Sequence, residues 1–111
     1  MTSGKDNQES IQQLQLLEQN LQGILAQKQQ FQSQLFELEN ALKEISSTKQ
    51  AYKIVGGIMV AAEKDELQKD LNQKKEIIEL RITSIEKQEK QLQEKAKSLQ
   101  QEIIADMKKE K

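Results

Sequence analysis

The side chains that carry most enzyme chemistry are scarce in this chain of 111 residues. It has no histidine and no cysteine, which removes the usual proton-transfer group near neutral pH, thiol nucleophiles and thiolate zinc ligands. The nearest thing to a reactive pair is Tyr52 beside Lys53. Neighbouring residues on a strand point to opposite faces, so these two would not converge on a substrate. We therefore expect no enzyme activity, no cofactor and no metal site.

Composition favours long helices and argues against binding to polyanions. The apolar content of 35% is below the roughly 45–50% of globular domains, and proline is absent among many Gln, Lys and Glu residues. The net charge is −1 and no basic stripe is visible, so we expect no nucleic-acid partner and no membrane partner. No segment approaches the ~20 apolar residues of a membrane span, nor does the start look like a signal peptide. The expected location is cytoplasmic.

Apolar residues recur at alternating steps of three and four in two segments, 8–46 and 63–108. This is the spacing of a coiled-coil seam, and we expect one left-handed helix pair. The first seam consists of Leu14, Leu17, Leu21, Ile24, Lys28, Phe31, Leu35, Leu38, Leu42 and Ile45. The second consists of Leu71, Lys75, Ile78, Ile82, Ile85, Glu89, Leu92, Ala96, Leu99 and Ile103. Residues 1–7 and 109–111 are predicted to be flexible tails.

The segment 51–61 between the helices predicts a β-hairpin. Two runs rich in β-branched residues flank Gly56-Gly57, and two glycines permit the positive φ angles of a two-residue turn. Pairing that is symmetric about these glycines also sets Leu42 against Leu71 in the helices. We therefore expect an antiparallel hairpin with both chain ends at one tip.

The predicted register brings two charged seam residues within one layer of each other. Lys28 and Glu89 could then interact across the helix pair. They either fix the alignment of the helices or extend separately to water.

Several apolar residues fall outside the seam and need another explanation. Both faces of the predicted hairpin are mostly apolar, which favours a sheet closed with strands of other subunits over a hairpin folded onto its own helices. Near the chain ends, off-seam apolar residues are either scattered or form a site for apolar partners. These are Ile11, Leu16, Leu25, Ile104 and Met107. Phe36, Ile77 and Leu80 lie nearer the strands, where subunit contacts are expected.

The order helix, hairpin, helix resembles the β-class subunits of the prefoldin family, and their archaeal form most. The resemblance is carried by Tyr52, Lys53, Val55 and Gly56, followed by Ile58, Met59 and Val60. It implies a mainly α fold: a long antiparallel two-helix coiled coil with a short β-hairpin that joins an intersubunit β-barrel. It also implies a hexamer of two α and four β subunits.

By the same resemblance, the chain is expected to be part of an ATP-independent co-chaperone. Coiled-coil tips would capture unfolded polypeptides and deliver them to a group II chaperonin. The candidate client-binding residues are Ile11, Leu14, Leu16, Leu17, Ile103, Ile104 and Met107. The candidate assembly residues are Tyr52, Ile54, Val55, Gly56, Gly57, Ile58, Met59 and Val60. A coiled-coil scaffold or tether with one dedicated partner is the alternative that periodicity leaves open.

Overall fold

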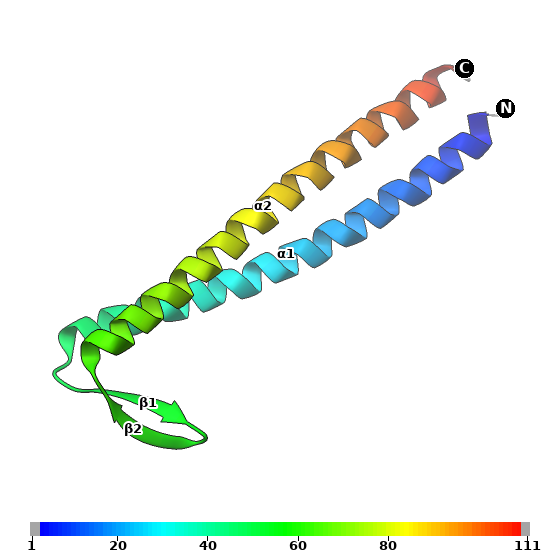
Figure 1. Cartoon of the computed structure of the whole chain (residues 1–111). Coiled ribbons are helices and arrows are strands. Elements are labelled where there is room, and N and C mark those ends of the chain that lie inside the picture. Colours follow the sequence, from blue (N-terminus) through cyan, green and yellow to red (C-terminus); the bar gives the residue numbers. More distant parts are fainter. Residues whose placement is uncertain (1–2, 110–111) are drawn as a thin grey trace. The chain divides into compact units, whose positions relative to one another are not determined.

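The chain forms two long helices joined by a two-stranded antiparallel hairpin (Figure 1). The computed structural model describes residues 3–109, and their side chains from residue 8 onward. The elements are α1 (Ser3–Ser47), β1 (Ala51–Val55), β2 (Ile58–Ala62) and α2 (Lys64–Lys109). This confirms the predicted mainly α class with one hairpin between the helices.

The helix boundaries differ most from the sequence prediction at the start of α1. Residues 3–7, expected to be a flexible tail, belong to α1, because no proline interrupts the helix before its first apolar residue. Lys109, the first residue of the other predicted tail, is the last residue of α2. The tails predicted at 1–2 and 110–111 lie outside the described residues.

Three hydroxyl side chains mark the end of α1. Ser46, Ser47 and Thr48 each donate a hydrogen bond to the carbonyl oxygen three residues earlier, at 2.7, 3.0 and 3.2 Å. Such bonds satisfy carbonyls that lack a helical partner at a C-terminus. The helix therefore ends at a run of three consecutive residues whose hydroxyls all compete for helical hydrogen bonds.

The hairpin turns at Gly56 and Gly57, whose φ angles are 56° and 79°. Both angles lie in the left-handed region, which glycine adopts without a steric penalty. The strands pair from Val55 with Ile58 through to Ala51 with Ala62. The strand register predicted from symmetry about the two glycines is therefore confirmed.

Local charges and one long-range hydrogen bond favour the start of α2. Asp65 and Glu66 occupy its first turn, where negative charge complements the partial positive charge of the helix N-terminus. The ammonium of Lys64 donates a 3.2 Å hydrogen bond to the carbonyl oxygen of Ser46. The first residue of α2 is thereby tied to the last turn of α1.

The chain divides into two compact units. Unit 1 comprises residues 1–28 and 84–111, and unit 2 comprises residues 29–83, including the hairpin. In each unit a stretch of α1 lies along a stretch of α2 through the predicted seam. All predicted seam residues are buried or half-buried. The seam of each unit is thus confirmed, and it is the main apolar layer that the chain builds for itself.

Candidate protein-binding surfaces

The hairpin in unit 2 is apolar on both faces, and neither face is covered between Tyr52 and Ala61. Ile54 and Met59 are paired on one face and are 72% and 66% exposed, while Val55 and Ile58 are paired on the other. Tyr52 and Val60 are exposed as well, and the sheet contains only these two strands. The outer edges of β1 and β2 therefore offer backbone hydrogen-bonding groups beside apolar side chains. The predicted assembly residues all lie on this uncovered element.

The predicted client-binding residues fall into two groups in unit 1. Ile11, Leu16, Ile104 and Met107 are exposed. Leu14, Leu17 and Ile103 belong to the seam, and Ile103 is only 8% exposed. The first group can meet a partner directly, whereas the second packs between the two helices.

A shallow groove of about 490 Å³ reaches part of that seam in unit 1. Leu17 from α1 and Leu99 from α2 both line it, with polar side chains around them. Leu17 is therefore accessible along one side of the helix pair although it is half-buried.

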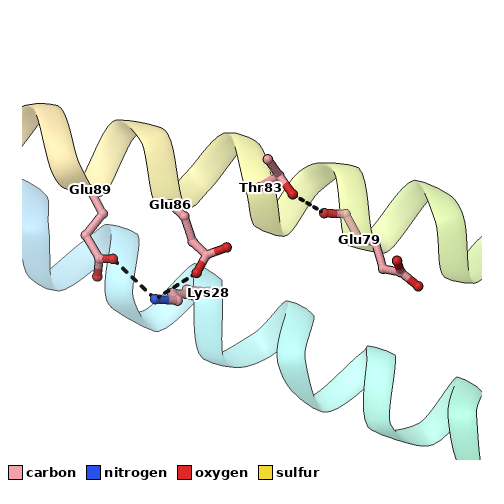
Figure 2. Close-up of polar contacts among 5 residues, drawn as sticks. All are labelled: Lys28, Glu79, Thr83, Glu86 and Glu89. Atoms are coloured by element: carbon pink, nitrogen blue, oxygen red, sulfur yellow. Dashed lines mark hydrogen bonds and ion pairs between the residues drawn. The ribbon is translucent and has the colours of Figure 1, made fainter.

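An ion-pair cluster interrupts the apolar seam of unit 1. The ammonium of Lys28 lies 3.2 Å from Glu89 Oε1 and 3.6 Å from Glu86 Oε2 (Figure 2). Lys28 therefore interacts with Glu89 across the helix pair, which is one of the two alternatives that the predicted register left open. Glu86 was missed, because it lies outside the seam and reaches Lys28 from the neighbouring surface.

The hydrogen bond that Lys28 donates to Glu89 raises the pKa of Lys28 above its ordinary value of 10.5. Burial opposes this shift, and the negative charges of Glu89 and Glu86 add to it. The pair therefore favours the charged form of Lys28 at neutral pH.

Unit 2 contains a second, more apolar groove of about 510 Å³ beside the helix seam. Leu38, Ala41, Ile77 and Ile78 line it, and the basic side chains of Lys74 and Arg81 stand among its polar lining residues. The groove was not predicted. A small residue at position 41, directly beside the seam, is the signal that could have pointed to it.

Neither a metal site nor a membrane span emerges from the described residues. No three acidic side chains among them come together as potential metal ligands. Neither helix contains, in its described part, a stretch long and apolar enough to cross a bilayer.

Comparison with known proteins decides the family. The model of the family described as "Prefoldin subunit" matches residues 8–110. The chain belongs to the prefoldin family. The prefoldin subunit beta of Archaeoglobus fulgidus is 36% identical over 99 residues, which cover 86% of this chain and 85% of that protein. The prefoldin subunit beta of Thermococcus kodakarensis is 40% identical over 94 residues, covering 82% and 80%.

A solved prefoldin structure has the same fold. The crystal structure of the prefoldin beta subunit from Thermococcus strain KS-1 superposes with a TM-score of 0.87 at 38% identity, covering 90% of each chain. The predicted resemblance to β-class prefoldin subunits is thus confirmed. Membership of the prefoldin family implies a co-chaperone role within an assembly of several prefoldin subunits.

Proposed function

We propose that this chain is a β-class prefoldin subunit that assembles through its hairpin and captures unfolded polypeptides in unit 1. The proposed assembly is a cytoplasmic hexamer of two α and four β subunits that acts without ATP and delivers its clients to a group II chaperonin. The observation that supports client capture best is the exposure of Ile11, Leu16, Ile104 and Met107 around the two chain ends.

The chemistry of these side chains suits partners that lack a defined shape. Leucine, isoleucine and methionine adapt to varied apolar surfaces, and methionine is the most flexible of them. Exposed apolar groups that no part of their own chain covers mark interaction sites in soluble proteins. In this proposal the four exposed residues make the first client contacts, and Leu14, Leu17 and Ile103 support them from the seam.

Assembly is proposed to occur through the hairpin because a two-stranded ribbon is marginal in water by itself. Strands from other subunits would pair with the free edges of β1 and β2 and cover the apolar faces. A closed intersubunit barrel removes every open edge, which an open sheet cannot do. Tyr52 to Val60 would then be buried among subunits.

The client-capture proposal is tested by reconstituting the chain with an α-class prefoldin subunit and following the aggregation of three unrelated unfolded proteins by light scattering, without ATP. We expect slower aggregation of all three. A chain carrying Leu16→Ser, Ile104→Ser and Met107→Ser should lose most of this protection, whereas a chain carrying Glu76→Ser and Thr83→Ser at exposed polar positions of unit 2 should keep it. Protection of one protein only, or equal effects of the two variants, would favour a tether with a dedicated partner.

Delivery is tested separately with a fluorescently labelled client. A group II chaperonin is added to the client-loaded assembly, and the label is followed by size-exclusion chromatography. We expect the label to move to the chaperonin fraction. Retention of the label by the prefoldin assembly would contradict delivery while leaving capture intact.

A further inference from the structure

Unit 2 exposes a large aromatic side chain that its own chain does not use. Phe36 is 65% exposed on α1, although phenylalanine is among the side chains that gain most from burial. It lies on the side of α1 away from the stripe formed by Gln34, Leu38 and Ala41, which faces the groove of unit 2. The unit therefore has a protruding apolar side chain on one side, Phe36, which we call the knob, and an apolar groove on another side.

The charge beside the knob is negative, whereas the groove lining is net positive, because Lys74 and Arg81 outnumber Glu37. Glu39 follows Phe36 by three residues, which places both on one side of the helix. Lys74 and Arg81 stand at the groove. Within the described residues the ion pairs are Lys28 with Glu86 and Glu89, and Lys75 with Glu79, so Glu39, Lys74 and Arg81 are free for another chain. Arg81 also lies over the ring of Phe31, 5.8 Å from its centroid, which holds its guanidinium near the groove.

The strand edges allow one kind of contact between copies that suits such a pair of surfaces. The free edge of β1 and the free edge of β2 are different surfaces, so joining one to the other is a head-to-tail contact. A knob on one side and a groove on another is also a head-to-tail arrangement. Both features belong to unit 2, where one neighbouring copy could engage the strand edge and the groove together.

We propose that the groove over Leu38 and Ile78 docks a second copy of this chain, whose Phe36 fills the groove while its Glu39 faces Lys74 and Arg81. This inference rests on the proposed function, because it adds a contact between helices to the assembly made by the hairpins. The contact would select β-class neighbours in one orientation, which strand pairing alone does not specify.

Disulfide trapping tests the contact directly because the chain has no native cysteine. Asn40→Cys places a thiol one turn after Phe36, and Gln34→Cys places one at the groove. The two single variants are mixed, reconstituted with a cysteine-free α-class subunit and oxidised, and the mixed disulfide is quantified by mass spectrometry. We expect at least tenfold more of it than in a matched mixture of Asn40→Cys with Thr83→Cys. Equal yields would overturn the proposal.

Knob and charge variants then identify the contact. Phe36→Ser in the Asn40→Cys chain should lower the disulfide yield about tenfold, while Thr83→Ser, at an exposed position on the side of α2 away from the groove, should leave it unchanged. Glu39→Lys in the Asn40→Cys chain and Lys74→Glu in the Gln34→Cys chain should each lower the yield, and a mixture of these two exchanged chains should restore at least half of it. Glu18→Lys, the same exchange in unit 1, is the control. No rescue by the double exchange would contradict the assigned charges.

Native mass spectrometry of the same samples separates this inference from the proposed function. If the chain assembles with the α-class subunit but gives no more mixed disulfide than the control mixture, the docking contact is overturned and assembly through the hairpin stays intact. A chain that stays monomeric with the α-class subunit would overturn both.

Discussion

The seam and the hairpin contain similar apolar residues, yet the chain covers one and leaves the other exposed. Ile78 and Ile85 in the seam are 8% and 7% exposed. Ile54 and Ile58 in the hairpin are open to solvent on opposite faces. The seam is therefore satisfied by one chain, whereas the hairpin carries residues whose burial needs other chains. The same residue type stabilises the fold in one region and, in the proposed assembly, contacts other subunits in the other.

This comparison predicts the largest effect on the single chain for a seam substitution. Ile85→Ala should lower the free energy of unfolding by about 2–4 kcal/mol, because it removes buried methyl groups and leaves a cavity between the helices. Urea unfolding followed by circular dichroism measures this change. Leu80→Ala on the exposed face of α2 is the matched control and should change stability by less than about 0.5 kcal/mol. Equal losses at the two positions would show that the seam is not the stabilising layer.

A turn substitution should have the next largest effect and act on the hairpin alone. Gly57 has a φ of 79°, and a side chain there costs roughly 1–2 kcal/mol in a left-handed conformation. Gly57→Val should therefore weaken assembly with an α-class subunit about tenfold, measured by titration in native mass spectrometry.

Two other glycine substitutions are the controls for the turn. Gly57→Asn should retain most of the assembly, because asparagine tolerates this conformation. Gly23→Ala in α1 should instead stabilise the chain by about 0.5–1 kcal/mol, since nothing lies within 4 Å of the position its Cβ would take. A destabilising Gly23→Ala would show that this helical glycine has a packing role.

The sequence predicted the helix seam and the strand register better than the side-chain contacts and the surfaces for other chains. Seam positions follow from a repeat of apolar residues, and the strand register follows from where two glycines permit a turn, so local rules were enough. The contact of Arg81 with Phe31 and the groove beside Ala41 depend on how side chains of two helices interdigitate. Client capture and barrel closure depend on other chains, so periodicity within one chain could suggest them only through a family resemblance.

Substitutions in the hairpin should change assembly far more than the stability of one chain. Ile54→Asp and Ile58→Asp place a charge on either face of an already exposed ribbon, so each should change the unfolding free energy of the isolated chain by less than about 0.5 kcal/mol. Each should nevertheless reduce the assembled fraction at least tenfold in native mass spectrometry, because a buried unpaired charge is costly. If one of the two variants assembles fully, the face of the hairpin that carries the substituted residue is exposed to solvent in the assembly and is not a subunit contact.

The smallest effect is expected at a charged layer of the seam, the interaction of Lys28 with Glu89. The pKa of Lys28 is raised in the folded chain. The contribution of this ion pair to stability is therefore complete below pH 10.5 and is lost as the pH rises through the folded-state pKa of Lys28. Wild type should therefore be more stable than Lys28→Met at neutral pH, with the difference shrinking above pH 10.5 in urea unfolding curves. Lys28→Met combined with Glu89→Met should recover stability, because no carboxylate is left unpaired in the seam. If the double variant is as unstable as the single one, the layer contributes through side-chain shape rather than charge, and the seam then follows packing rules along its whole length.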